Sequence, residues 1–268
     1  MKIARIFEKI ENTFTAEFGD SVVTDKKELV NYCNKYWFKD VTVNTCRGYL
    51  QYINIYLKEK NIDCKLNVTD FNVKDAKDGL VSKKEIMSYI DILENEQDKF
   101  IIYALFSGIS GKEVEELRTL KVEQIDLENK KIILPSRVVE MDDTLAQLAE
   151  DAIKQDTYDL MKFSDGASVQ SFEFNMASEY VIKNRPTKTN NMGLDAIKYD
   201  AFRKRLKTIT QYLGNKVTPD ILIKSGYAYM VYKEYGKDAT YTQVEKLIKE
   251  KSMKASIRNV INAYKNIY

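Results

Sequence analysis

The sequence predicts a mainly α-helical protein with a small β-sheet, an α+β chain divided into two domains. Only 3 prolines and 10 glycines occur among 268 residues, and both residue types disfavour helix interiors. Apolar residues recur at spacings of three and four in several segments, which is the period of an amphipathic helix. We therefore expect an N-terminal helical domain at residues 1–60, a linker at 61–81 and a second domain at 82–268.

Three helices are expected in the N-terminal domain. The first has an apolar face made of Ile3, Ile6, Phe7 and Ile10. The second starts near Asp25, and the third runs from about Thr42, an N-cap residue type, to Lys58. After residue 60 the periodicity is lost and Asn, Asp and Lys are frequent, which is typical of a linker.

The second domain is expected to open with a helix at 83–93, because Ser82 and Glu85 have the spacing of a capping box. Residues 125–139 carry short apolar runs around Asn129-Lys130-Lys131, which predicts short β-strands. The other expected elements are helices at 96–108, 111–121, 196–213, 219–235 and 241–263, with 141–215 mostly helical apart from a break near 185–193.

Composition excludes several classes of function. There is no histidine, and the three cysteines (Cys33, Cys46 and Cys64) have no C-x-x-C spacing, so we expect no metal site and no cofactor. Reduced cysteines without a secretory segment indicate a cytoplasmic protein, and no apolar run approaches the roughly 18 residues of a membrane span. A net charge of +2 does not by itself indicate a nucleic-acid partner.

The most distinctive segment reads Ser110-Gly111-Lys112-Glu113-Val114-Glu115-Glu116-Leu117, with Leu120 and Gln124-Ile125-Asp126 after it. It resembles the first signature box of the tyrosine recombinases, the phage-integrase family, which reads T-G-x-R-x-x-E-L and then a Leu and D-I-D. Glu113 stands where that family has its first catalytic arginine, and a carboxylate there would repel the phosphate that the arginine clamps. As an alternative, Glu113, Glu116 and Asp220 would have to converge to bind Mg²⁺.

Two further segments resemble the later boxes of the same family. Thr218–Ser225 keeps the frame of T-P-H-x-L-R-H-[ST], and Val244, Leu247 and Ile248 keep the apolar frame of V-x-x-L-L-G-H. The positions of the family's histidines, second arginine and tyrosine nucleophile hold other residues here: Asp220, Ile223, Lys224, Glu250 and Asn259. The resemblance implies a two-domain clamp around a DNA duplex, and the replacements imply that this member is not an enzyme.

Basic and polar residues are expected to contact the DNA backbone, because a clamp of this kind holds phosphates. They lie at the start of the third helix, in the break near 185–193, along the 196–213 helix and towards the C-terminus: Asn44, Thr45, Arg47, Gln51, Lys183, Arg185, Lys188, Arg203, Lys204, Arg205, Lys207, Lys216, Lys224, Lys254 and Arg258. The alternative is that these residues only form solvated helix faces and an ordinary exposed loop.

Together, the resemblance and the replacements predict a non-catalytic, sequence-specific double-stranded DNA-binding protein, most simply a transcriptional repressor of a phage or other mobile element. One alternative is an active recombinase with a shifted nucleophile, Tyr264 or Tyr268. Another is a modulator that binds a true recombinase, or a protein that self-associates, through the C-terminal helix. Its apolar anchors would be Val260, Ile261 and Tyr264.

Overall fold

The computed structural model describes residues 2–19, 23, 25–38, 41, 43–71, 80–160, 170–214 and 217–268. Its N-terminal part contains the helices α1 (Lys2–Phe18), α2 (Lys26–Tyr36) and α3 (Val43–Glu59) and the 3-10 turn η1 (Val68–Asp70). The three predicted helices are confirmed, and Asp25 is the N-cap of α2, since its side chain accepts a hydrogen bond from Lys27 N at 2.8 Å. Residues 72–79 of the predicted linker lie outside the described residues.

The second part of the chain is also mainly helical. Its helices are α4 (Lys83–Ile92), α5 (Glu96–Phe106), α6 (Glu115–Arg118), α7 (Asp143–Lys154), α8 (Tyr199–Leu213), α9 (Pro219–Tyr235), α10 (Tyr241–Glu250) and α11 (Ile257–Ile267). The predicted capping box is present, since the Ser82 hydroxyl accepts from Glu85 N at 3.3 Å and Ser82 N donates to the Glu85 carboxylate at 2.9 Å. This box satisfies backbone donors at the start of α4.

A small antiparallel sheet lies between α6 and α7. Its strands are β1 (Ile125–Asp126), β2 (Lys131–Leu134) and β3 (Arg137–Glu140), in the order β1-β2-β3. The side chains of β2 alternate between exposed and buried, as expected for a strand with one face on the core. The predicted strands and the mainly α class with a small sheet are therefore confirmed.

Two predicted helices are wrong in extent. In place of a helix at 111–121, the structure has the 3-10 turn η3 (Lys112–Val114) and the single turn α6, because Gly111, Glu113 and Val114 have φ of 84°, 53° and 58°. Left-handed backbone does not continue a right-handed helix. The helix expected at 241–263 is divided into α10 and α11, and Ser252 between them has a φ of 49°.

The prediction of mostly helical structure after α7 is also wrong. β4 (Thr157–Asp159) and β5 (Ser171–Glu173) form a two-stranded antiparallel sheet, and the 3-10 segment η5 (Lys188–Gly193) follows. The ring of Tyr158 packs on those of Phe172 and Phe174, with centroids 5.2 and 5.9 Å apart. Aromatic pairs across neighbouring strands stabilise such a sheet, which outweighs the local helix propensity.

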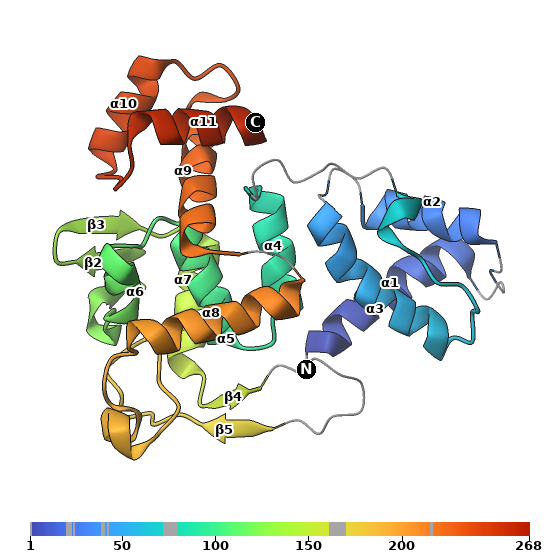
Figure 1. Ribbon diagram of the computed structural model, residues 1–268, viewed down its shortest axis with the longest axis horizontal. Helices are drawn as coiled ribbons and strands as arrows, with labels where there is room; N and C mark the ends of the chain where they lie inside the picture. Colours follow the sequence, from blue (N-terminus) through green and yellow to red (C-terminus); the bar gives the residue numbers. More distant parts are fainter. Residues whose placement is uncertain are drawn as a thin grey trace.

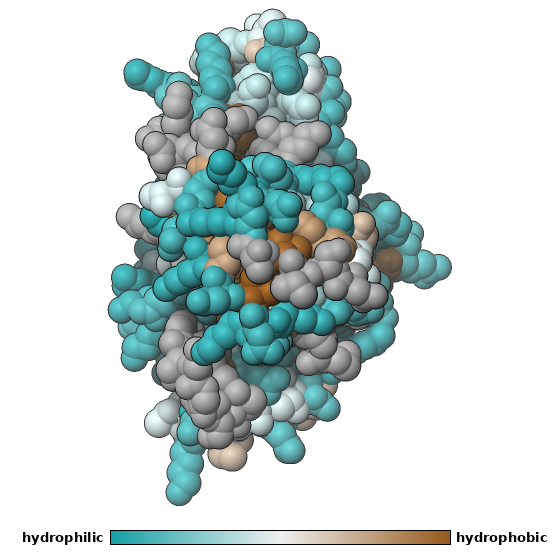
Figure 2. Space-filling model, turned by 90° about the vertical axis from the view of Figure 1, so that its right-hand side faces the viewer, coloured by the Kyte–Doolittle hydropathy of each residue, from teal (hydrophilic) through white to brown (hydrophobic). Residues whose placement is uncertain are grey.

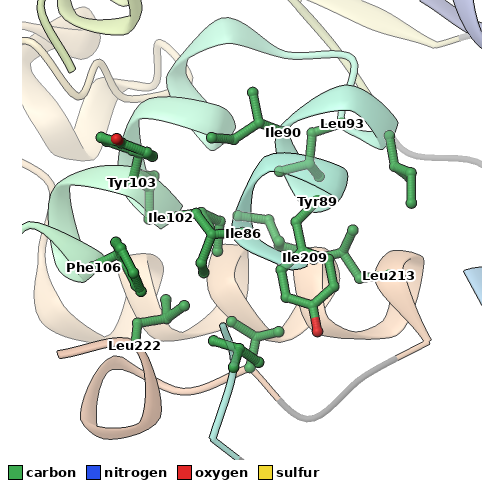
Figure 3. Packing of buried hydrophobic residues seen from close by; sticks show 14 of the residues in the cluster. Ile86, Tyr89, Ile90, Leu93, Ile102, Tyr103, Phe106, Ile209, Leu213 and Leu222 are labelled. Carbon is green, nitrogen blue, oxygen red and sulfur yellow. The ribbon is translucent and has the colours of Figure 1, made fainter. Parts of the chain in front are cut away.

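One continuous hydrophobic core joins the two parts of the chain, from Ile6 in α1 to Leu222 in α9. Figure 3 shows its centre, where side chains of α4, α5, α8 and α9 meet. The approach of α9 to α5 is closest at Gly226, where a Cβ would lie 1.6 Å from the carbonyl oxygen of Phe106. The crossing therefore requires glycine. A second, smaller cluster packs α9 against α10 and α11.

Figure 1 shows the N-terminal helices on one side of the second part, with α10 and α11 at the far end of α9. The face formed by the N-terminal helices is mostly hydrophilic, with hydrophobic residues gathered near its centre (Figure 2). Polar contacts join the two parts: Thr45 Oγ1 donates to Glu85 at 3.3 Å, and the hydroxyls of Tyr52 and Tyr212 lie 3.0 Å apart. These contacts hold α3 against α4 and α8.

Candidate nucleic-acid interface

Three residues expected to contact DNA are buried, so this part of the prediction is wrong. Thr45 is 1% exposed and faces Glu85 of α4, and Lys183 is 2% exposed. The side chain of Arg205 is 10% exposed. Each is held by partners inside the protein, and none can reach a phosphate without rearrangement of the core.

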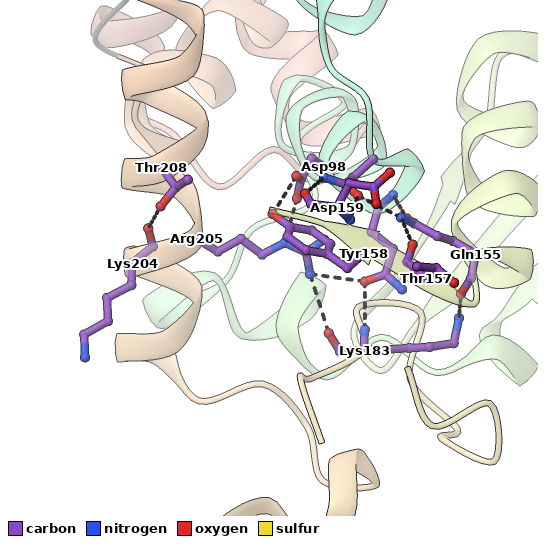
Figure 4. A network of polar contacts seen from close by, with 11 residues as sticks. Asp98, Gln155, Thr157, Tyr158, Asp159, Lys183, Lys204, Arg205 and Thr208 are labelled. Carbon is purple, nitrogen blue, oxygen red and sulfur yellow. Dashed lines mark hydrogen bonds and ion pairs between the residues drawn. The ribbon is translucent and has the colours of Figure 1, made fainter. Parts of the chain in front are cut away.

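Arg205 belongs to a buried polar network between α5, α8 and β4 (Figure 4). Its Nε donates to Asp98 Oδ1 at 2.6 Å, and its Nη1 donates to Gln97 Oε1 at 3.1 Å. The Tyr158 hydroxyl donates to the other Asp98 oxygen at 2.9 Å, and its ring lies 4.6 Å from the guanidinium. Because the two charges are paired and hydrogen-bonded, they fix α8 against α5.

Lys183 closes the C-terminal end of α7. Its Nζ donates to the carbonyl oxygens of Ala152, Ile153 and Gln155 at 3.2, 2.7 and 3.4 Å. These are carbonyl groups that a helix end leaves without intrahelical partners. Burial, and then the charge of Arg205, lower the pKa of Lys183 to about 8. The role of this lysine is structural.

The outer side of α8 carries cations that are free to bind a partner. Arg203, Lys204 and Lys207 are exposed, and Figure 4 shows Lys204 extending away from the buried network. Within the part of the chain that the structure describes, none of these three has an ion pair. Asp200 is the one acidic residue in α8, and Arg203 rests on Tyr199 with its guanidinium 5.6 Å from the ring centroid. This face is therefore strongly cationic.

Helix α3 approaches the C-terminal end of α8 and also carries exposed polar residues. The two helices meet at Gly48, where a Cβ would lie 3.8 Å from the carbonyl oxygen of Leu213. On the outer side of α3, Arg47 and Gln51 are exposed and lie one helical turn apart. Arg47 has no ion pair among the described residues. The side chain of Asn44 lies outside the described part of the structure.

The loop before α8 adds two further exposed cations, Arg185 and Lys188. Neither has an ion pair among the residues described, and the Arg185 guanidinium lies 5.2 Å from the Phe172 ring centroid. Arg118 Nη1 donates to Ile197 O at 2.9 Å, which ties the segment between this loop and α8 to α6. We use the name basic strip for Arg47, Gln51, Arg185, Lys188, Arg203, Lys204 and Lys207. Lys216, also expected to contact DNA, lies outside the described residues.

The first signature segment forms a closed ion cluster. The side chain of Glu116 is 9% exposed and accepts hydrogen bonds from Ser110 N, Arg137 Nη2 and Lys254 Nζ at 2.9, 2.8 and 2.6 Å. Burial by itself would raise the pKa of Glu116, but the donors from Arg137 and Lys254 hold it below its usual value. Arg137 also donates to Gly108 O at 2.7 Å. Lys254 is exposed but already has a carboxylate partner.

Arg137 is a site residue that sequence reasoning missed. It lies 21 positions from Glu116 in the chain, so no local pattern shows that they pair. An indirect signal existed, because Arg137 follows the turn Pro135-Ser136 between β2 and β3. In the family that Ser110–Leu117 resembles, this hairpin presents a catalytic lysine.

A cleft of about 620 Å³ lies beside the ion cluster. Its lining includes three lysines and three glutamates: Lys112, Glu115, Glu116, Lys121, Glu123 and Lys254. Lys121 pairs with Glu179 at 3.1 Å and Lys254 with Glu116 at 2.6 Å. Glu113 is exposed and does not line the cleft. Carboxylates next to lysines that are already paired oppose the binding of a phosphate.

Four lysines near the C-terminus also have carboxylate partners. Lys224 pairs with Asp220 at 2.7 Å on the first turns of α9. Three lysines of α10 and the following turn also have carboxylate partners: Lys246 with Glu250, Lys249 with Glu245, and Lys251 with Glu140. Arg258 is exposed and has no ion pair in the described ranges. The C-terminal lysines are thus weaker candidates for phosphate contacts than the basic strip.

The two tyrosines of the recombinase alternative lie in helix packing. Tyr264 is 3% exposed, and its hydroxyl donates to Gly236 O at 2.7 Å and accepts from Ala239 N at 3.2 Å. The ring of Tyr268 stacks on Tyr232 with centroids 4.3 Å apart, and burial raises the pKa of Tyr268 to about 12. A nucleophile needs an accessible, activated oxygen, and neither hydroxyl meets this need in this structure.

The proposed anchors of the C-terminal helix are covered by the chain itself. Val260 and Tyr264 are buried in the cluster of α9, α10 and α11, and Ile261 packs against it. Self-association through this helix stays a prediction, because these side chains already have partners within one copy.

Among the described residues there is neither a metal-binding cluster nor a helix that could span a membrane. Over the ranges that the structure describes, no group of three His, Cys, Asp or Glu residues could hold a metal ion. Glu113 and Asp220 are both exposed, and Asp220 pairs with Lys224. No helix in the same ranges is both long and apolar enough to cross a bilayer.

Comparison with known proteins shows the family of this chain. The chain belongs to the family described as "MrpR, C-terminal catalytic domain", whose model matches residues 80–266. With this membership, the resemblance that the signature segments indicate is confirmed at the level of the family. A relative, the SPbeta prophage-derived uncharacterized protein YopR of Bacillus subtilis (strain 168), is 24% identical over 262 residues, which is 88% of this chain and 78% of the relative.

Two solved structures are similar across nearly the whole chain. The crystal structure of XerA recombinase is 13% identical with a TM-score of 0.47, and the match covers 98% of this chain and 86% of that one. The Tn1549 transposon integrase in complex with circular intermediate DNA is 11% identical with a TM-score of 0.46, and the match covers 98% and 95% of the two chains.

Proposed function

We propose that this protein is a non-catalytic, sequence-specific double-stranded DNA-binding protein on a tyrosine-recombinase scaffold, and that it represses transcription of a prophage or other mobile element. The observation that carries the proposal is the contrast between two sets of cations. The six cations of the basic strip have no carboxylate partners among the described residues, whereas Lys121, Lys224, Lys251 and Lys254, near the signature segments, each have one.

The basic strip suits a duplex because it crosses both parts of the chain on rigid elements. α8 is fixed from beneath by the Arg205–Asp98 pair, and α3 is fixed to it by the Tyr52–Tyr212 contact. Because the helices are fixed, only the side chains of these cations lose freedom when they contact phosphates. Release of counterions then supplies much of the affinity, and base edges read from α8 and α3 add sequence preference.

The residue types that cleave a DNA strand are absent from the family's catalytic positions in this sequence. The first arginine position is the exposed Glu113, and the second is the half-buried Ile223. The nucleophile position is Asn259, whose amide cannot form a phosphotyrosine link. A protein with this set can occupy a DNA site but has no group with which to cut it. Occupying a site without cutting it is the action of a repressor.

The prophage relative supports the biological setting of the proposal. YopR is named as prophage-derived, and a repressor keeps a prophage silent by covering its promoters. The recombinase alternative is disfavoured by the buried hydroxyls of Tyr264 and Tyr268. The modulator alternative is disfavoured by the cover that α11 already has within one copy.

The test is recovery of DNA fragments from the host and prophage genome by the purified protein, followed by transcription in vitro from the recovered fragments. We expect discrete fragments that contain promoters, and lower transcript yield when protein is added. Random recovery without enrichment would contradict sequence-specific binding. Enrichment without any effect on transcription would contradict repression and leave DNA binding intact.

A further inference from the structure

The loop that precedes α8 has an unusual backbone. In η5, Asn191 and Met192 have φ of 51° and 54°, and Gly193 follows with 88°. Glycine adopts such values freely and asparagine does so occasionally, but methionine rarely does. Two consecutive residues other than glycine in this region persist only where their surroundings fix them.

Side-chain amides fix this loop from inside and from outside. Asn190 Nδ2 donates to Arg185 O at 2.8 Å, and Asn190 Oδ1 accepts from Thr187 N and Gly193 N at 2.9 and 3.0 Å. From the segment after β5, Asn175 Nδ2 donates to Met192 O at 3.0 Å. The loop is thus a rigid projection whose shape is set before any partner binds.

The tip of this projection is apolar and its flanks are cationic. Met192 is 53% exposed and belongs to neither hydrophobic cluster of the described residues. The same loop carries Arg185 and Lys188, which are exposed and without ion pairs in the described chain. An exposed apolar side chain in a segment with two exposed cations complements a partner that offers an apolar contact and negative charge.

We infer that this loop inserts into the minor groove of the bound duplex, with Met192 as a wedge at a base step and with Arg185 and Lys188 on the flanking phosphates. The inference rests on the proposed DNA binding. Methionine is among the side chains that act as wedges in the minor groove, and cations beside it hold the backbone. Arg118 donates to Ile197 O at 2.9 Å, which ties the segment between this loop and α8 to α6.

Rigid bracing gives the wedge its selectivity. Unstacking costs least at flexible pyrimidine–purine steps, so a fixed wedge favours sites that have such a step at one position. Asn190 acts as a positioning residue, because its amide joins Arg185, Thr187 and Gly193 without facing the DNA itself.

The experiment compares a duplex that carries a genomic site recovered by the protein with a scrambled duplex of equal length and composition. The recovered site is labelled with 2-aminopurine at each pyrimidine–purine step in turn, because its fluorescence rises when the base is unstacked. We expect the wild type to raise the fluorescence at one step. Met192→Ala should lose this rise and about tenfold in affinity for the site, with affinity for the scrambled duplex nearly unchanged.

Two further variants separate the wedge from folding. Met192→Gly removes the side chain but suits the left-handed backbone, so it should lose the same selectivity without a lower melting temperature. Val138→Ala is the matched control, because Val138 is 55% exposed on β3, away from the loop, and it should change neither signal.

The outcomes distinguish failure of this inference from failure of the proposed function. If the wild type does not discriminate between the two duplexes, sequence-specific binding is wrong and the wedge falls with it. If the wild type discriminates and both Met192 variants do so equally well, the wedge alone is wrong. A change of oligomeric state in Met192→Ala, with DNA selectivity intact, would assign the loop to a protein partner and would also overturn the inference.

Discussion

Removal of the cations on α8 should reduce the salt dependence of DNA binding, measured as the slope of log K against log salt. The variant replaces Arg203, Lys204 and Lys207 with alanine. The basic strip holds six cations without ion pairs: Arg47, Arg185, Lys188, Arg203, Lys204 and Lys207. If each contacts one phosphate, the slope of log K against log salt is about −5, and the triple variant should have a slope near −3.

The consequence for affinity is large enough to measure by fluorescence anisotropy of a labelled duplex. Between about 50 mM and about 200 mM salt, the wild type should lose roughly a thousandfold in affinity and the triple variant only roughly sixtyfold. The effect should be the same on specific and scrambled duplexes, because phosphate contacts carry no sequence information.

The matched control replaces Lys246, Lys249 and Lys251 with alanine. It lowers the net charge by the same three units, but each of these lysines already has a carboxylate partner. We expect its slope to stay close to that of the wild type. An equal fall in slope for both variants would mean that bulk charge and not the basic strip drives binding. An unchanged slope in the α8 variant would refute the basic strip altogether.

Three further predictions concern stability and domain contact. Gly226→Ala should lower the free energy of unfolding by several kcal/mol, because its Cβ would lie 1.6 Å from Phe106 O. Gly48→Ala, whose Cβ would lie 3.4 Å from Ile92 Cδ1, should change this free energy by less than about 1 kcal/mol. Urea unfolding measures both variants, and similar values would contradict the crossing geometry. The pKa of Lys183 is lowered to about 8, so above that pH the unfolded chain binds more protons than the folded one. Between pH 8 and the usual pKa of lysine, the free energy of unfolding should therefore rise by about 1 kcal/mol per pH unit relative to Lys183→Met. Parallel pH profiles of the two proteins would contradict this. The single tryptophan, Trp37, is 5% exposed and lies in the crevice between the two parts of the chain. If α3 and α8 stay joined, its fluorescence emission wavelength should not shift on DNA binding. A red shift would mean that the two parts separate.

The helices could be predicted from the sequence because their signals are local. The capping box of α4 and the apolar spacing of α1 and α3 depend on residues a few positions apart. Local signals also place Arg205 towards the buried face of α8, because it lies three residues after Phe202 and four before Ile209. Periodicity could therefore have separated Arg205 from Lys204, which lies on the opposite side of the helix.

Which lysines form ion pairs could not be predicted, because their carboxylate partners are distant in sequence. Lys254 pairs with Glu116 across 138 positions, and Lys251 pairs with Glu140 across 111. From sequence alone these lysines look as available for DNA as Lys207. The left-handed backbone at Glu113 and Met192 is hidden for a similar reason, since tertiary hydrogen bonds and packing impose it on residue types that do not favour it.

The central claim is that the protein binds DNA but does not cut it, and the most direct test uses one duplex for both properties. A recovered site is prepared with a nick that would trap any covalent intermediate, incubated with the protein, and divided between a native and a denaturing gel. We predict a shifted complex on the native gel and, on the denaturing gel, intact strands without attached protein. A protein–DNA adduct that survives denaturation and disappears in Tyr264→Phe or Tyr268→Phe would contradict the account and would show an active recombinase.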